Sequence, residues 1–302
     1  MPLDADHVID RRRLKRRLAF WRVLGVVAVV AAVVAAVGRF GFVGRDFVAR
    51  VNVEGIVLDD PWRDRALAAI AGNSRARALI VRINSPGGTV AGGEALYSNL
   101  RKLSEKKPVV AVMAEIATSG GYMAALGADY IVARGGSITG SIGVILQTTD
   151  VTGLLEKVGV KVEAIKSRPL KAQPSPLEPL TPEGRAAARS VVLDFFDMFV
   201  DMVAERRRIL RDSVLTLADG RIFTGRQAKD NGLIDALGGE PEAREWLAET
   251  RKIPVSLPIR DVEIERDEGL WRELLGGVVG KALFSERLKL DGLISLWHPK
   301  QW

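Results

Sequence analysis

The sequence predicts an α/β domain built on a parallel β-sheet. Two apolar runs, at residues 78–83 and 109–114, have the length and composition of strands that are buried on both faces. Each run is followed by a glycine-rich turn and then by a helical pattern. Because successive turns of this kind project from the same edge of a parallel sheet, we expect a functional site at that edge.

The second of these turns gives a serine the surroundings that a nucleophile needs. Ser119 lies in the sequence Ala-Thr-Ser-Gly-Gly-Tyr at 117–122, directly after the apolar run and before a short helical pattern at 122–126. Its hydroxyl would lie among backbone N–H groups at a strand-to-helix turn, which is a favourable place for an anion. The alternative is that the serine only caps the helix.

The composition restricts which base could activate this serine. The chain of 302 residues has no cysteine, and its two histidines, His7 and His298, lie near its ends. This excludes disulfides and thiol nucleophiles and argues against a histidine base or a histidine-ligated zinc in a central domain. The remaining suitable base is a lysine that burial keeps neutral. The net charge of +7 is concentrated near the N-terminus, so it does not indicate a nucleic-acid surface.

The N-terminal region predicts a membrane anchor. Residues 1–22 form a basic tail, and the uncharged stretch 23–38 would span about 24 Å as a helix. Flanking apolar residues extend the predicted transmembrane helix to 18–43, enough for a hydrocarbon core of about 30 Å. The excess of Arg and Lys on the amino side predicts a cytoplasmic N-terminus and a domain on the outer, periplasmic or extracytoplasmic, side of the inner membrane. The alternative is a signal peptide cleaved at the Ala-Val-Gly sequence at 36–38.

The first half of the predicted domain, which spans 46–260, alternates strands and helices. Alternation of apolar and polar residues predicts a strand at 47–58, and Asp60 with the proline after it begins a helix to about residue 71. The remaining elements are the strand at 78–83, a helix at 89–103, the strand at 109–114, the helix at 122–126 and a strand at 130–133. A glycine-rich connection follows at 135–144, for which a strand with bulges is the alternative.

The second half contains more helix. We expect a helix at 151–158, an extended segment at 162–165, and then a segment to residue 182 whose prolines prevent regular structure. A helix from Thr181 to about residue 208 carries an apolar stripe that indicates core or a subunit contact. The last elements are a turn at 219–220, a short helix from 223 ending near Gly232, a helix at 241–250 and a strand at 255–259. The tail at 261–302 includes an amphipathic stretch that suits either a membrane interface or a subunit contact.

Six short motifs in this order resemble the signal peptide peptidase A family of bacterial membrane-bound serine proteases. They cover residues 84–88, 118–122, 139–144, the surroundings of Lys171, 219–221 and 232–235. Each motif is weak alone, but together they span most of the predicted domain. The resemblance implies a fold similar to Clp protease and crotonase, a spiral of strand-strand-helix units, and a chain that needs no cofactor or metal.

The resemblance also implies roles for particular residues. Ser119 matches the family's nucleophile, Lys171 its general base, and Ser141 the serine that orients the lysine. The oxyanion hole would combine the backbone amide of Gly87 or Gly88 with that of Gly120.

In this family the serine and the lysine of one site come from neighbouring subunits of a ring-like homo-oligomer. Lys166, five residues before the matching lysine, is a rival base.

These residues predict a membrane-anchored serine endopeptidase with a Ser-Lys dyad. Its substrates would be signal-peptide remnants and other hydrophobic peptides bound in extended form, hydrolysed through an acyl-enzyme. Two alternatives remain open: a non-catalytic membrane scaffold of the same fold, and a crotonase-type enzyme acting on acyl-CoA. Covalent labelling of Ser119 would distinguish the peptidase from both.

Overall fold

The structure is a computed structural model that describes residues 17–32, 45–264 and 293–296. It divides into two compact units, Met1–Asp46 and Phe47–Trp302. In the first unit, residues 17–32 form a helix whose side chains are exposed. None of the helices in these three ranges is both long enough and apolar enough to span a membrane. Residues 33–43 of the predicted anchor, the alternative cleavage site at 36–38 and the amphipathic part of the tail lie outside the described residues, so these remain predictions.

The second unit is built on a mostly parallel sheet, as the sequence predicts. Its central strands all pair in parallel, in the order β9-β1-β2-β3-β4-β8. They are β1 (Phe47–Val57), β2 (Ala76–Thr89), β3 (Val109–Thr118), β4 (Tyr130–Ala133), β8 (Ala236–Leu237) and β9 (Ile259–Asp261). The strands β2 and β3 continue beyond the predicted apolar runs and include the Ser-Pro-Gly-Gly motif and the residues up to Thr118.

Three helices cross between these strands: α2 (Pro61–Gly72), α3 (Val90–Ser104) and α4 (Gly120–Ala125). The first two begin at side-chain caps, because Asp60 accepts hydrogen bonds from the N–H groups of Trp62 and Arg63, and Thr89 accepts one from Gly92. One face of the sheet packs on these helices and the other on α9 (Glu240–Arg251). Both faces are therefore covered, which explains why the strands read as continuous apolar runs.

A smaller group of elements lies beyond the carboxyl end of β3. The strand β5 (Ile138–Gly140) pairs in parallel with the last residues of β3 and antiparallel with β7 (Ile222–Thr224). The helix α8 (Gly225–Asp230) follows β7 directly. The helix predicted from residue 223 is thus a strand followed by a helix. The glycine-rich connection at 135–144 contains the strand β5, which agrees with the alternative that this connection is a strand with bulges.

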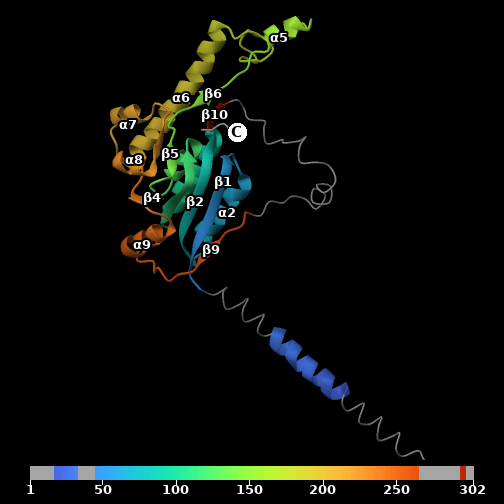
Figure 1. Cartoon of the computed structure of the whole chain (residues 1–302), viewed down its shortest axis with the longest axis vertical. Helices are drawn as coiled ribbons and strands as arrows, with labels where there is room; N and C mark the ends of the chain where they lie inside the picture. Colours follow the sequence, from blue (N-terminus) through green and yellow to red (C-terminus); the bar gives the residue numbers. More distant parts are fainter. Residues whose placement is uncertain (1–16, 33–44, 265–292, 297–302) are drawn as a thin grey trace, which may run out of the picture. The chain divides into compact units, whose positions relative to one another are not determined.

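The remaining helices are α5 (Thr152–Lys157), α6 (Pro182–Arg207) and α7 (Arg211–Leu217). The amino half of α6 and the segment that carries α5 project away from the sheet (Figure 1). One strand prediction was wrong in detail, because the strand expected at 255–259 begins only at Ile259, where pairing with Val48 starts. Residues 162–165, which we expected to be extended, belong to no helix or strand.

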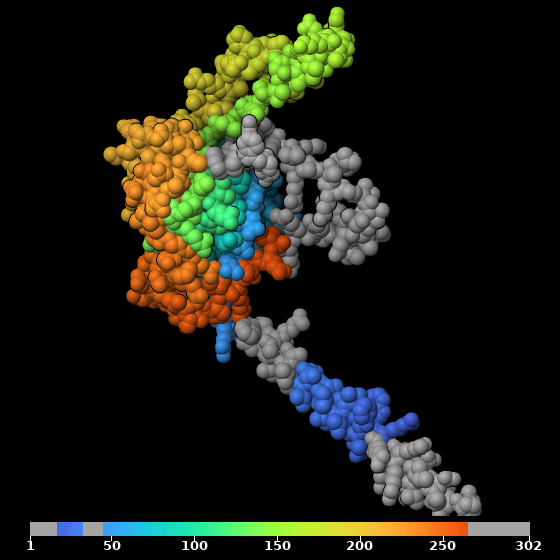
Figure 2. Space-filling view, viewed as in Figure 1, coloured from blue at the N-terminus to red at the C-terminus, as the bar shows by residue number. Residues whose placement is uncertain are grey.

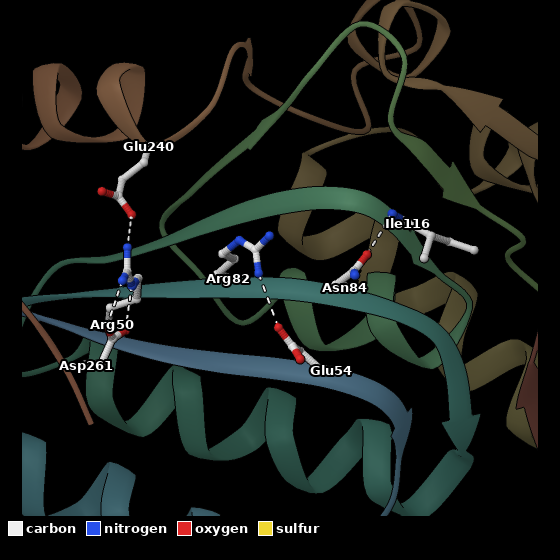
Figure 3. Close-up of polar contacts among 7 residues, drawn as sticks. All are labelled: Arg50, Glu54, Arg82, Asn84, Ile116, Glu240 and Asp261. Carbon is white, nitrogen blue, oxygen red and sulfur yellow. Dashed lines mark hydrogen bonds and ion pairs between the residues drawn. The ribbon is translucent and has the colours of Figure 1, made fainter. Parts of the chain in front are cut away.

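Arg50 on β1 connects β1 to the edge strand β9 and to the helix α9 (Figure 3). Its guanidinium donates to both carboxylate oxygens of Asp261 on β9, at 2.6 and 2.7 Å, and to Glu240 at the start of α9, at 2.7 Å. Since the three side chains are partly exposed, we expect these ion pairs to contribute little to the free energy of unfolding. Their main effect would be to fix the positions of β9 and α9 relative to β1.

Candidate active site

Ser119 occupies the turn between β3 and α4 in a strained backbone conformation. Its φ and ψ are 54° and −121°, and its exposed fraction is 1%. Two backbone hydrogen bonds hold it there: its N–H donates to the Gly140 carbonyl, and its carbonyl accepts the Met123 N–H, both at 2.8 Å. A non-glycine residue with such a φ typically costs about 1–3 kcal/mol, and such strain is concentrated at functional sites. The serine is therefore held in place by the fold, and its side chain makes no capping hydrogen bond to α4.

Glycines allow the neighbouring elements to approach this turn. A Cβ atom at Gly121 would lie 3.0 Å from the Ser85 carbonyl oxygen. One at Gly93 on α3 would lie 3.0 Å from the Met123 sulfur and 3.3 Å from the Gly120 Cα. The helices α3 and α4 and the end of β2 can thus surround the serine only because these positions lack side chains.

The Ser-Pro-Gly-Gly turn at the end of β2 is fixed to the adjacent β3. The Thr118 hydroxyl donates to the Pro86 carbonyl at 3.0 Å, and the Ile116 N–H donates to the Asn84 side chain at 3.3 Å (Figure 3). These bonds place the turn beside Ser119.

Ser85 and Gly87 organise the inside of the same turn. The buried Ser85 hydroxyl accepts the Gly87 N–H at 3.1 Å and lies 3.2 Å from the Gly87 carbonyl, to which it donates. Ser85 is therefore a turn residue. Gly87 has a φ of 119°, a conformation that favours glycine, so the turn also explains the residue type at this position.

Ser141 lies beside Ser119 and has the same kind of backbone conformation, with a φ of 52°. Its N–H donates to the Arg221 carbonyl at 2.8 Å, and its exposed fraction is 8%. Both serines line a pocket of about 480 Å³ whose other walls are mainly apolar. These walls are formed by Ile142, Gly143, Val144, Ile145, Val192, Leu193, Phe196, Ala218, Asp219 and Gly220. Two predicted site residues are thus brought together in one apolar pocket.

The structure does not bring the predicted lysine into this pocket within one chain. Lys171 is exposed in the segment between α5 and α6 and is not among the lining residues. Lys166 forms an ion pair with Glu178 in the same segment. Figure 2 shows this part of the chain standing clear of the sheet. The expectation of a buried, desolvated lysine is therefore not met by a single copy of the chain.

The sequence analysis missed the part of α6 that lines the pocket. Val192 and Phe196 belong to the apolar stripe that predicted core or a subunit contact, and Leu193 lies next to Val192 in the chain. Only the carboxyl half of that stripe, from Phe199 onward, is buried in the core. The amino half of the stripe is half-exposed and lines the pocket, whereas the carboxyl half is buried. No pattern in the sequence marks this change, because it depends on where α6 leaves the sheet.

A larger concavity of about 690 Å³ lies elsewhere, beside α2 and β9. Phe47, Trp62, Arg65, Ile70 and Val262 are among its lining residues. The described residues that line it include no serine, threonine or lysine. The smaller pocket therefore remains the candidate site, because it combines mainly apolar walls with two serines in a strained backbone conformation.

Tyr122 connects the serine turn to the motif at 232–235. Its hydroxyl donates to the Leu233 carbonyl at 2.9 Å. Complete burial raises the pKa of the Tyr122 phenol, so it stays protonated and able to donate. The Leu233 segment is in turn fixed by Arg207, which donates to the Gly232 carbonyl and forms a two-bond ion pair with Asp235. The motif thus supports the helix that follows Ser119.

We expect Tyr122→Phe to lower the free energy of unfolding by about 1–3 kcal/mol, because the Leu233 carbonyl would lose its partner in a buried place. Chemical denaturation of both proteins measures this. Tyr130→Phe is the control, since the Tyr130 ring stacks on Trp246 with centroids 4.7 Å apart and keeps that contact. Equal losses for the two variants would contradict the role given to the Tyr122 hydroxyl.

The chain is similar to known proteases along most of its length. Residues 101–254 match the family described as peptidase family S49. "Putative protease slr0021" of Synechocystis is 41% identical over 77% of this chain and 84% of its own length. "Protease 4" of Haemophilus influenzae is 32% identical over 65% of this chain and 33% of its own length. "Putative signal peptide peptidase SppA" of Enterococcus faecium is 34% identical over 62% and 55%, respectively.

Proposed function

Because the chain belongs to peptidase family S49 and is a protease similar to signal peptide peptidase A, we propose that it is a serine endopeptidase with Ser119 as nucleophile and Lys171 as general base. The observation that carries the proposal is the strained, buried Ser119 beside Ser141 in an apolar pocket. The Clp protease-like spiral is part of the proposal. The successive crossovers from β1 through β3 and the second group formed by β5 and β7 support it.

The proposed reaction has two steps. The Ser119 hydroxyl attacks the peptide carbonyl while its proton passes to the neutral Lys171 amine, and the leaving amine of the substrate takes that proton as an acyl-enzyme forms. Water then attacks the acyl carbonyl while the same lysine takes its proton and passes it to the departing Ser119 oxygen, which releases the acid and restores both residues. The charge on the tetrahedral oxygen would be held by the amide of Gly120, which opens α4, and by that of Gly87 or Gly88. Of these last two, the Gly87 N–H donates to the Ser85 hydroxyl in this structure. Ser141 would hold the lysine in place.

The distance of Lys171 from the pocket in one chain is the reason to propose an assembly. The segment that carries it exposes apolar side chains that the described residues leave uncovered, among them Leu154, Val158, Leu177 and Ile165, which is 97% exposed. A projecting segment with this much exposed apolar surface suits contact with another protein. We assign that contact to a neighbouring copy of the same chain, which would receive Lys171 in its own pocket.

The residues that line the pocket also indicate which substrates to propose. Its walls are mainly aliphatic and aromatic, from β6 (Ile145–Leu146), α6 and the residues after Ser141. Small or apolar side chains would fit such a pocket, so we propose hydrophobic peptides and signal-peptide remnants as substrates. A location at the inner membrane, with the protease unit outside the cytoplasm, would place the site where such fragments arise.

Mixing two inactive variants tests the shared site. Ser119→Ala and Lys171→Ala should each be inactive against a fluorogenic hydrophobic peptide, whereas Lys166→Ala should keep its activity. Chains of the two inactive variants, unfolded together and reassembled at equal amounts, should recover roughly a quarter of the wild-type rate, because that fraction of neighbouring pairs combines both intact residues.

No recovery from the mixture would show that both groups act within one chain. Loss of activity in Lys166→Ala, with retention in Lys171→Ala, would instead assign the base to Lys166.

A further inference from the structure

The turn at 219–221 lies against the two serines of the candidate site and has no part in the reaction described so far. It connects α7 to β7. Asp219 and Gly220 line the same pocket as Ser119 and Ser141. The turn is thus close enough to the reacting groups to influence their positions.

A chain of backbone hydrogen bonds leads from this turn to the nucleophile. The Arg221 carbonyl accepts the Ser141 N–H, and the Gly140 carbonyl accepts the Ser119 N–H, both at 2.8 Å. Gly140 is also paired with Ile222, the residue directly after Arg221, in the ladder between β5 and β7. The dipeptide Gly140-Ser141 is therefore held on one side by Arg221, and on the other side it holds Ser119.

Asp219 fixes the Arg221 end of this chain. Its Oδ1 accepts the Arg221 backbone N–H at 3.1 Å, which closes a turn of the kind that aspartate and asparagine side chains form. Its two carboxylate oxygens also accept the Arg221 Nε–H, at 2.8 and 2.7 Å, and Nη2 of the same guanidinium completes the ion pair. The Asp219 side chain thus binds both the backbone and the side chain of Arg221, whose carbonyl receives the Ser141 N–H.

This arrangement contributes more to position than to stability. The side chains of Arg221 and Asp219 are 64% and 43% exposed, and ion pairs with such exposure contribute little to the free energy of unfolding. Ser141, in contrast, has a positive φ, and a non-glycine residue keeps that conformation only where its surroundings fix it. The contacts of Asp219 are therefore placed where they can hold a strained serine although they add little stability.

We propose that Asp219 is a positioning residue of the peptidase, which fixes Ser141 through Arg221 and so keeps Ser141 and Ser119 in register. The proposal rests on the proposed function in taking Ser141 as the residue that orients the Lys171 amine. Since displacement of a catalytic group by about 1 Å can cost about 10²-fold in rate, a loosened turn should slow the chemical step. The hydrogen bond to the Arg221 N–H carries this role, because it acts on the backbone, whereas the ion pair reaches only the exposed end of the side chain.

Three variants of the full-length chain test this role. Asp219→Ala removes both the acceptor of the Arg221 N–H and the ion pair, whereas Asp219→Asn keeps the acceptor oxygen and removes the charge. Arg211→Ala is the matched control, because Arg211 is also exposed and also pairs with carboxylates, those of Asp197 and Asp201. Arg211 is not among the described residues that line the pocket.

We expect Asp219→Ala to lower kcat for a fluorogenic hydrophobic peptide roughly tenfold and to change KM by less than about twofold. Asp219→Asn should recover most of this loss, and Arg211→Ala should have the kcat of the wild type. The midpoint of denaturant unfolding should be the same in all four proteins. An unchanged kcat in Asp219→Ala would overturn the proposal. An Asp219→Asn protein as slow as Asp219→Ala would also overturn it, because the loss would then follow the charge or, with a lowered midpoint, the folding.

Hydrogen exchange separates this inference from the proposed function, because it requires no reaction. Exchange of the Ser141 and Ser119 amides, resolved by mass spectrometry, should be roughly threefold faster or more in Asp219→Ala than in Asp219→Asn or Arg211→Ala. Faster exchange in a protein whose wild type hydrolyses nothing would support the link from Asp219 to the serines and contradict the peptidase mechanism. Hydrolysis by the wild type, with the same exchange in all variants, would support the mechanism and contradict the positioning role.

Discussion

Replacing Ser119 by alanine should lower kcat/KM for a hydrophobic peptide by about 10⁴-fold or more, because loss of a nucleophile removes the covalent route altogether. We do not expect either of the neighbouring serines to replace it as the nucleophile. The nearby Ser85 hydroxyl is engaged with Gly87 in its own turn, and Ser141 is the residue expected to hold the lysine. Steady-state hydrolysis of a fluorogenic peptide by wild type and variant measures the loss.

A second variant at the same position separates chemistry from folding. Ser119→Gly removes the same hydroxyl but also relieves the strain of the positive φ, which alanine keeps. Both variants should be inactive, and the glycine variant should be more stable than the alanine variant by roughly 1 kcal/mol. If Ser119→Ala kept full activity, the mechanism would be wrong. If it lost activity only because it failed to fold, its denaturation curve would show this.

Replacing Gly88 by alanine should have the largest effect on stability. A Cβ atom there would lie 1.8 Å from the Val57 carbonyl oxygen and 2.7 Å from the Val57 nitrogen. Both atoms belong to the backbone of β1, which is paired with β2 at this very position. The clash can be relieved only by separating the two strands, so we expect a loss of more than about 3 kcal/mol in the free energy of unfolding, measured by denaturant titration.

Gly136→Ala is the control for this prediction. A Cβ atom at Gly136 would meet nothing within 4 Å, so this change should alter stability by less than about 0.5 kcal/mol. A Gly88→Ala protein as stable as Gly136→Ala would show that β1 and β2 do not approach as closely as described, and it would remove the reason for a glycine at this position of the proposed oxyanion hole.

The alternation of strands and helices from β1 to α4 could be predicted from the sequence because local signals agree there. Strands buried on both faces require continuous apolar runs, and side-chain caps such as Asp60 and Thr89 mark where α2 and α3 begin. The same agreement placed Ser119 correctly at the strand-to-helix turn. Ser141 was suggested only by the family resemblance, and the structure places it on the same pocket as Ser119. Both residues directly follow strands that pair with each other, β3 and β5.

Elements that depend on distant partners could not be predicted in this way. Ile259 starts β9 only because it pairs with Val48, some two hundred residues earlier, and nothing local distinguishes it from Val255. The tail was read as amphipathic, and a strand at Leu293–Leu296 was not foreseen, since its partners are the glycines at the end of β2. Lys171 is a stronger case of the same limit, because within the described part of one chain it does not reach the pocket that contains Ser119.

Covalent labelling of Ser119 tests the central claim most directly. The full-length protein is treated with a fluorophosphonate, digested, and the modified residue is identified by mass spectrometry, with Ser119→Ala as the control. The account predicts one added phosphonyl group, on Ser119 in wild type and none in the variant, together with loss of peptidase activity in proportion to labelling. Full peptidase activity in a protein whose Ser119 stays unmodified, or equal labelling of the Ser119→Ala chain, would contradict it.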